Sequence, residues 1–378
     1  MNEGKRFDVL DSWRGIAACL VALYHFRTRT YSHLTDVALL RNSYLFVDFF
    51  FVLSGFVIAT NYQQRLIEGF GIWRFALLRF GRLYPLHVSM LGILILHQLA
   101  NSMSGLRTIA PFQVPHQSAD TIIANLLLIH SLGVFDFLTW NWQSWSISTE
   151  FYTYILYALA IGVIKDRIWR VLVPVVLLSP LALWFLVGNM DTTYDYGIIR
   201  CVFGFSAGVL VWNLHRTGWL RSGTALELLS VALIIVFVWS AGTTALSIGA
   251  PFVFAIAVLV FAAEAGAVSG ALRKRVFLVL GALSYSIYMV HFEVAALLIG
   301  AAKLLEKTAG TALFSGIALG RERWEGDVAF LIYFALVLFV SAITYRMIEV
   351  PGRAWFRRLA GSRLYSENSR VDLQRPVP

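Results

Sequence analysis

The chain has 378 residues, of which 58% are hydrophobic and only 14% are charged, and apolar runs recur along its whole length. This composition excludes an ordinary soluble domain and indicates a membrane protein. The net charge of +9 does not indicate a nucleic-acid partner, because the excess Lys and Arg lie in short links between apolar runs. The sequence contains no Walker loop, dinucleotide-binding glycine fingerprint, Gly-x-Ser-x-Gly elbow or His-Glu-x-x-His motif, so ATP-driven pumps, nicotinamide enzymes and zinc proteases lack support.

Ten apolar segments are long enough to cross a bilayer as helices. They fall at about 8–28, 43–62, 83–100, 146–164, 171–188, 197–214, 224–242, 246–264, 277–300 and 328–348. The first has no small-residue cleavage site, so we expect a retained helix. The sequence therefore predicts an all-α polytopic membrane protein with about ten transmembrane helices. We expect residues 1–360 to form one membrane domain and residues 361–378 to form a disordered cytoplasmic tail.

A further apolar stretch, residues 121–134, is short for a span. If it does not cross, most basic residues fall on one side of the membrane, which is then the cytoplasmic side. The basic residues on that side are Lys5, Arg6, Arg65, Arg74, Arg79, Arg82, Lys165, Arg167, Arg170, Arg216, Arg221, Arg273, Lys274, Arg275, Arg353, Arg357 and Arg358. If it did cross, the clusters at 165–170 and 273–275 would face outward. We therefore predict a re-entrant or outer-face segment and two cytoplasmic termini.

Ionisable side chains inside apolar segments indicate functional sites, because a charge is costly in hydrocarbon. Arg14 and His25 are eleven residues apart, so they share one helix face at a separation of about 16 Å along the axis. A fixed charge near the cytoplasm and a titratable imidazole farther along could face a common cavity. The alternative is that Arg14 extends to lipid headgroups while His25 caps the outer end of the helix.

Two other positions could carry chemistry. Arg79 and Arg82 share one face at the cytoplasmic start of the third helix, where guanidinium groups could hold phosphate oxygens; topological anchoring is the alternative. Glu150 follows Trp145-Ser146-Ile147-Ser148-Thr149 at the outer entry of a helix. Its carboxylate could orient His25 as a base, although an acid at a helix N-terminus is also explained by the helix dipole.

The remaining embedded polar residues have structural explanations. We expect Asp48 to pair with Arg41 or His25, and Ser54 to permit close helix approach. Arg200 and His291 bring no spacing that identifies a reaction, so supporting hydrogen bonds are expected for both. A second group, His87, His97 and His130, has no acid or Cys at ligand spacing, and we predict no metal site.

The order and spacing of six motifs resemble the membrane acyltransferase-3 family, which contains acetyltransferases of bacterial surface polysaccharides and nodulation factors. The motifs are Leu10–Ala17 followed by His25, Phe49–Phe56, Arg79–Pro85, Trp145–Glu150, Leu283–His291 and Tyr345–Pro351. They extend over most of the chain. The resemblance implies an integral protein of the bacterial inner membrane that transfers an acyl group, with acetyl-CoA as donor substrate.

The resemblance also implies roles for individual residues. It places His25 and Glu150 at the acyl-transfer centre and assigns Arg14, Arg79 and Arg82 to donor binding. Supporting polar roles fall to Asp48, Ser54, Trp145, Ser146, Arg200, Tyr285 and His291. His25 would take the proton of an acceptor hydroxyl as it attacks the thioester, while Glu150 steadies the imidazolium. The acceptor would be an extracytoplasmic saccharide or related hydroxyl compound.

Two alternatives remain at this stage. Some family members carry a fused extracytoplasmic hydrolase-like domain, and this sequence shows none, so the chain is expected to act alone or with a separate extracytoplasmic transferase. Embedded Arg, His and carboxylate groups also build transporters, which makes a secondary transporter the rival class. The sequence shows no matching halves with Gly- or Pro-broken helices, the pattern typical of inverted-repeat transporters.

Overall fold

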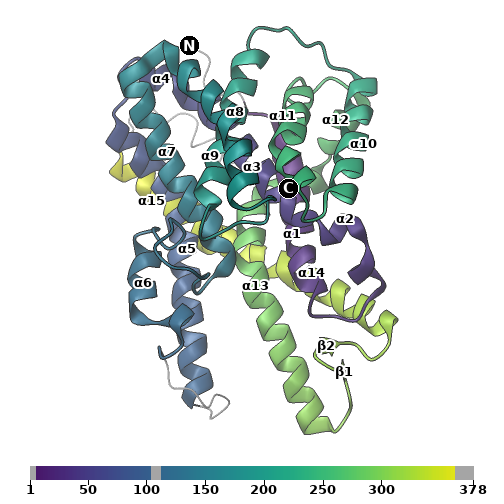
Figure 1. Cartoon of the computed structure of the whole chain (residues 1–378). Helices are drawn as coiled ribbons and strands as arrows, with labels where there is room; N and C mark the ends of the chain where they lie inside the picture. The colour runs from purple at the N-terminus through teal and green to yellow at the C-terminus, as the bar shows by residue number, and fades with distance from the viewer. Residues whose placement is uncertain (1–5, 104–111, 362–378) are drawn as a thin grey trace.

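A computed structural model describes residues 6–103 and 112–361 of the chain, so the predicted tail at 361–378 lies outside the described residues except for its first residue. The predicted all-α class is confirmed, because the described residues form helices joined by short links and one small hairpin (Figure 1). The helices are α1 (Asp8–Arg27), α2 (Ala38–Arg41), α3 (Phe46–Ile58), α4 (Gln64–Ile67), α5 (Ile72–Met103), α6 (Ala119–Leu126), α7 (Trp145–Ile164), α8 (Trp169–Leu186), α9 (Gly197–His215), α10 (Thr224–Ala241), α11 (Ala250–Phe261), α12 (Ala267–Leu272), α13 (Arg275–Ala309), α14 (Arg323–Thr344) and α15 (Val350–Leu359).

Shorter elements connect them. The 3₁₀ turns are His33–Asp36, Ser43–Leu45, Pro115–Gln117, Trp142–Ser144, Lys165–Ile168 and Ala245–Gly249. Two π-helical segments, Ala59–Gln63 and Tyr345–Glu349, lie between α3 and α4 and between α14 and α15. Strands β1 (Phe314–Ser315) and β2 (Ala318–Leu319) pair antiparallel. Because π segments often lie at functional sites, these two are places to look for one.

Seven helical stretches of the described chain are long and apolar enough to cross a membrane. They are Ser43–Ile67, Ile72–Ala100, Trp142–Leu186, Gly197–His215, Thr224–Ala241, Arg275–Ala309 and Arg323–Leu359. The count of about ten spans and the cytoplasmic termini therefore stay predictions. Helix α1 forms where predicted but is not among the seven, since Asp11, Arg14 and His25 lower its hydropathy. Helix α6 has only eight residues, or about 12 Å, too short to span.

Helices α1 and α13 run side by side and form the centre of the bundle. Gly15 and Gly281 face each other, and a Cβ atom at Gly15 would lie 2.5 Å from the backbone nitrogen of Gly281. Ten residues farther along each helix, His25 is hydrogen-bonded to His291. The two helices are therefore parallel and in register, with glycine at one contact because any side chain there would force the backbones apart.

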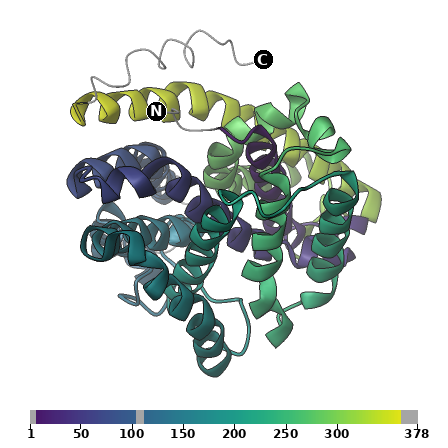
Figure 2. The same cartoon turned by 90° about the horizontal axis from the view of Figure 1, so that it is seen from above.

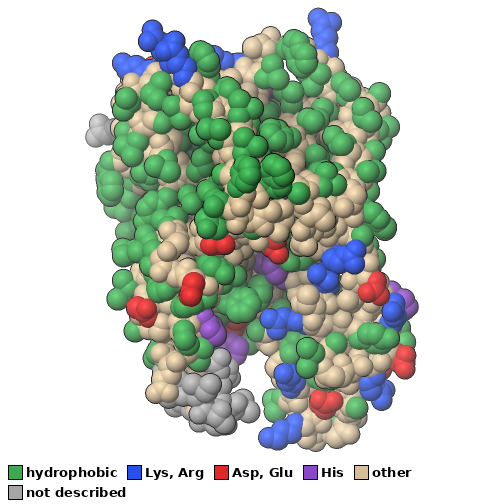
Figure 3. Space-filling model, viewed as in Figure 1, with side chains coloured by type: hydrophobic (Ala, Val, Ile, Leu, Met, Phe, Trp, Pro, Cys, Tyr) green, Lys and Arg blue, Asp and Glu red, His purple; other side chains and the backbone are tan. Residues whose placement is uncertain are grey.

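The two long helices extend beyond the apolar part of the bundle. Helices α5 and α13 contain 32 and 35 residues, or about 48 and 52 Å, against about 30 Å for the hydrocarbon core. Their C-terminal ends project as two arms below the other helices, and in the view from above α14 and α15 lie along one side of the bundle (Figures 1 and 2). Figure 3 shows apolar side chains covering the upper part of the face, with Lys and Arg at the top and a hollow between the arms.

Candidate active site

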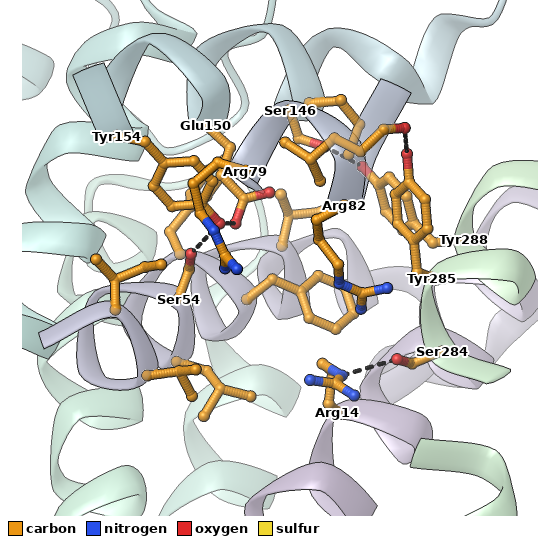
Figure 4. A pocket seen from close by; sticks show the side chains of 18 residues that line it. Arg14, Ser54, Arg79, Arg82, Ser146, Glu150, Tyr154, Ser284, Tyr285 and Tyr288 are labelled. Atoms are coloured by element: carbon orange, nitrogen blue, oxygen red, sulfur yellow. Dashed lines mark hydrogen bonds between the residues drawn. The ribbon is translucent and has the colours of Figure 1, made fainter. Parts of the chain in front are cut away.

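A cavity of about 130 Å³ opens among α1, α3, α5, α7 and α13. Its charged lining consists of three arginines, Arg14, Arg79 and Arg82, and one acid, Glu150. These four residues come from three helices, and their charged groups point into the same space (Figure 4). Three positive charges against one negative charge give the cavity a surplus of positive charge, which suits an anionic ligand such as a phosphate-bearing donor.

Each arginine is held differently. Arg14 donates from Nε to Ser284 Oγ over 2.8 Å and from Nη2 to the carbonyl of Gly281 over 3.0 Å, and it forms an ion pair with Asp11. Arg79 donates to the hydroxyl of Tyr62 over 3.3 Å, and its guanidinium carbon lies 5.0 Å from the centre of that ring. Among the described residues Arg79 has no carboxylate partner, so its charge is the one most available to a ligand.

Arg82 is fixed by a buried carboxylate that sequence reasoning did not single out. Glu349, only 1% exposed, accepts hydrogen bonds from Arg82, from Arg353 and, over 2.8 Å, from the hydroxyl of Ser286. The guanidinium of Arg82 also lies over the ring of Tyr285 at 5.3 Å. Glu349 is the last residue of the second π segment, and its carboxylate reaches both α5 and α13. With two arginines on one acid, this cluster keeps a net positive charge.

Glu150 faces the cavity and not the histidines. Its Oε1 accepts a hydrogen bond of 2.5 Å from the hydroxyl of Tyr154, one turn along α7, and that hydroxyl also contacts Ser54 Oγ at 2.7 Å (Figure 4). The predicted site residues Ser54 and Glu150 are thus joined through a tyrosine. Nearby, Ser146 bonds the hydroxyl of Tyr288 over 2.8 Å, which places a third polar group from α7 on the cavity wall.

His25 is paired with His291 at the end of the parallel helices. Nδ1 of His25 lies 3.0 Å from the carbonyl of Val21 and 3.1 Å from Nε2 of His291, while Nδ1 of His291 lies 2.7 Å from the carbonyl of Tyr288. One tautomer assignment fits all three contacts: both histidines carry hydrogen on Nδ1, and the Nδ1 hydrogen of His25 is shared between the carbonyl of Val21 and Nε2 of His291. Nε2 of His25 is then left with its lone pair, as a general base requires.

The geometry changes two expectations about partners. His25 and Glu150 were expected to form a dyad, but the hydrogen bonds of His25 go to Val21 and His291 and that of Glu150 comes from Tyr154. Asp48 was expected to bind Arg41 or His25 and instead accepts two hydrogen bonds, of 2.8 and 2.7 Å, from Arg200.

Which residues of two helices contact each other depends on how each helix is rotated about its own axis. Residue spacing within one helix does not determine that rotation. Asp48 and Arg200 are 0% and 1% exposed, and Trp145, whose ring lies 5.2 Å from the guanidinium carbon of Arg200, covers the pair. These three residues tie α3, α7 and α9 together. Tyr285, also expected as a supporting residue, donates to the carbonyl of Leu83 over 2.5 Å. The structure therefore places the expected supporting residues around the cavity or between its helices.

Comparison with known proteins identifies the family of the chain. An acyltransferase domain is matched by residues 7–346 of the chain. The chain belongs to this acyltransferase family. "Protein 2 in picA locus" of Rhizobium radiobacter is 40% identical over 105 residues, which cover 28% of this acyltransferase and 52% of that protein, so the chain spans about half the length of this curated relative. No solved structure matches the acyltransferase. The rival transporter hypothesis gains no support from these matches.

Sequence reasoning missed the residues that hold the predicted ones. Glu349 lies in a recognised motif, Tyr345–Pro351, but nothing in that motif indicates that its acid reaches Arg82, 267 residues earlier. Tyr154, one turn after Glu150, could have been proposed from its spacing of four residues, which brings the two side chains together on one helix face. Ser284 and Tyr288 lie in the motif that ends at His291, on the helix that carries both contacts to α1.

Proposed function

We propose that this membrane acyltransferase transfers an acyl group, with acetyl as the expected group, from cytoplasmic acyl-CoA to a hydroxyl of an extracytoplasmic saccharide or related envelope acceptor. The convergence of Arg14, Arg79 and Arg82 in one cavity carries this proposal. Guanidinium groups bind phosphate oxygens through paired, charge-assisted hydrogen bonds, and coenzyme A presents several phosphates. All three arginines lie in the parts of their helices nearest the basic ends that the sequence assigns to the cytoplasm.

The thioester would then lie toward the histidine pair. Tyr288 lines the cavity and precedes His291 by three residues on α13, an axial rise of about 4.5 Å. A donor held by its phosphates at the arginines would extend past Tyr288 toward His25. Such positioning converts the attack of the acceptor into a reaction within one complex, which lowers the barrier without new covalent chemistry.

The proposed chemistry balances through one proton. The acceptor oxygen attacks the thioester carbonyl as Nε2 of His25 takes the hydroxyl proton, and the carbon–sulfur bond breaks to release the thiolate. The proton held by His25 neutralises the thiolate, so the products are an ester and a free thiol. His291 fixes the ring of His25 and accepts its Nδ1 hydrogen, the orienting role that the Asp has in a Ser-His-Asp triad. Glu150, bonded to Tyr154, is proposed to act on the donor side of the site.

The proposal extends to organisation and location. We place the site in a single membrane domain, residues 1–360, of a bacterial inner-membrane protein that binds acyl-CoA, lipid and a carbohydrate acceptor. Transfer to the acceptor is either direct or through a separate extracytoplasmic transferase. The donor and acceptor are its substrates, and the chemistry described uses only side chains of this chain.

The test measures thiol release from acetyl-CoA and acyl incorporation into de-O-acylated envelope polysaccharide, with the protein in nanodiscs. His25→Ala is expected to lower turnover by about 10²- to 10⁴-fold, the usual contribution of a positioned base. His33→Ala is the matched control, because His33 lies in an exposed 3₁₀ turn and bonds Asp327 instead of the site. If a folded His25→Ala variant keeps wild-type turnover, the base assignment is wrong. If folded wild-type protein uses no short acyl-CoA, the donor assignment is wrong.

A further inference from the structure

A row of aromatic rings leads away from the histidine pair. The ring of Phe292 lies 5.1 Å from that of His25 and 5.6 Å from that of His291, and the ring of Trp142 lies 5.8 Å from Phe292. Trp142 is 43% exposed, so a large part of this indole is open to a ligand. We call Trp142 and Phe292 the aromatic shelf. It begins at the proposed base and ends at the surface.

The backbone of α13 holds the shelf in place. Gln143, directly after Trp142, donates from Nε2 to the carbonyl of Met289 over 2.8 Å, and Asn141, directly before it, contacts the same carbonyl at 3.5 Å. Both of these flanking side chains are buried. An exposed tryptophan between two anchored neighbours has a fixed position, unlike one on a free loop. A preformed platform loses little conformational entropy when a ligand binds.

Polar groups that can bind hydroxyls lie beside the shelf. Glu293, which follows Phe292, bonds through Oε1 to Nδ1 of His97 on α5 over 2.6 Å, and the described residues give its other carboxylate oxygen no hydrogen bond. The guanidinium carbon of Arg29 lies 5.5 Å from the centre of the Phe292 ring. The Arg29 guanidinium thus lies against one ring of the shelf, and the Glu293–His97 pair begins at the residue that follows Phe292.

The location of these groups fits an acceptor that arrives from water. His97 and Glu293 join α5 and α13 just before the two helices continue into the projecting arms. Figure 3 shows the hollow between those arms, bordered by histidine and basic side chains. Both helices are longer than the hydrocarbon core is thick, so part of each extends beyond it, and the arms are the parts that project from the rest of the bundle. The arginine cavity, by contrast, lies among α1, α3, α5, α7 and α13 within the bundle.

We infer that the aromatic shelf is the binding platform for a saccharide ring of the acceptor. This inference rests on the proposed function and names the part of the protein that selects its acceptor. The C–H face of a pyranose is apolar with slightly positive hydrogens, and it packs on the negative face of an aromatic ring. The hydroxyls at the rim of the sugar then donate to the second carboxylate oxygen of Glu293 and accept from Arg29. A sugar on the shelf presents a neighbouring hydroxyl to His25.

The test compares KM values for the acceptor and the donor. Trp142→Ala and Glu293→Gln are each expected to raise the KM for de-O-acylated polysaccharide at least tenfold and to leave the KM for acetyl-CoA within twofold. Trp142→Phe should recover most of the acceptor affinity, because it retains an aromatic face. Trp219→Ala is the matched control: Trp219 is 71% exposed and lies in the link between α9 and α10.

The outcomes separate the shelf from the proposed function. If wild type transfers acyl groups and Trp142→Ala leaves the acceptor KM unchanged, the shelf is not the acceptor site, although the function stands. If Trp142→Ala lowers only the thermal stability in nanodiscs, the indole is an anchor at the membrane interface and the inference is overturned. If wild type releases no thiol and labels no polysaccharide, the proposed function itself fails, and the shelf fails with it.

Discussion

Two buried ion pairs of this acyltransferase use the same chemical groups for different ends. Asp48 and Arg200 are 0% and 1% exposed, and the acid takes both of its hydrogen bonds from one arginine. Glu349 is equally buried, but it is shared by Arg82 and Arg353, and the side chain of Arg82 is 22% exposed and lines the cavity. The first pair is closed and neutral. The second is open and keeps a positive charge.

The difference shows why burial of a charge does not by itself identify a site. A closed pair can be replaced by apolar residues of similar size with little loss of stability, because its desolvation cost nearly cancels its attraction. An open pair with an unbalanced charge costs more, and the protein retains it next to a cavity where a ligand can complete it. A binding site is therefore better indicated by an excess of cationic side chains over carboxylates around a cavity than by burial of a charge.

The largest effect is expected when one partner of the closed pair is removed. Asp48→Ala leaves Arg200 buried without a counter-charge and should destabilise the fold by about 3–5 kcal/mol. Asp48→Leu combined with Arg200→Met should restore most of that stability. Thermal unfolding in nanodiscs measures both variants, and a double variant as unstable as Asp48→Ala would show that the pair is more than a structural link.

The same apolar exchange should have another outcome at the open pair. Arg82→Met with Glu349→Leu and Arg353→Met removes the whole cluster and should leave a folded protein with a KM for acetyl-CoA raised ten- to a hundredfold, because a charge-assisted hydrogen bond is worth about 1.5–3 kcal/mol. Direct binding of coenzyme A to the purified variant gives the affinity. Unchanged affinity would remove Arg82 from the donor site.

A smaller change tests how Glu349 positions Arg82. Glu349→Asp keeps the negative charge and withdraws the carboxylate by one methylene, so we expect a donor KM raised about fivefold, roughly 1 kcal/mol, with turnover little changed. Arg353→Lys, which alters the other partner of the acid, is the control. Equal effects from both substitutions would indicate a general loss of packing instead of a positioning role.

The smallest expected effect is a difference in salt dependence between the open pair, Arg82 with Glu349, and the closed pair, Asp48 with Arg200. Raising NaCl from about 0.05 to 0.5 M should increase the donor KM two- to fivefold, since ions screen an accessible arginine cluster from phosphate. The melting temperature of wild-type protein should hardly respond through Asp48 and Arg200, which are shielded from solvent. A donor KM that does not depend on salt would argue against phosphate binding at the arginines.

Much of the fold and the arginine lining of the cavity could be predicted from the sequence. The apolar runs gave the helices, and the motifs gave the three arginines that the structure brings into one cavity. The pairings could not be predicted in the same way. His25 lies beside His291, and Asp48 beside Arg200, because of how whole helices rotate against one another, and one sequence carries no information on that rotation. Likewise, the contact of Glu349 with Arg82 joins residues 267 positions apart, and no local pattern indicates it.

The register between α1 and α13 fixes the distance between two contacts of these helices. Gly15 faces Gly281, and His25 faces His291, ten residues farther along both helices, about 15 Å along the axis. With two contacts on each helix, neither can slide past the other. On the proposed function, the helix pair α1 and α13 fixes the distance between the donor-binding residue Arg14, next to the glycine contact, and the two histidines. A donor in which the phosphates and the thioester are too close together would bind at the arginines without bringing its thioester to the histidines. The fixed distance would therefore select donors by their length.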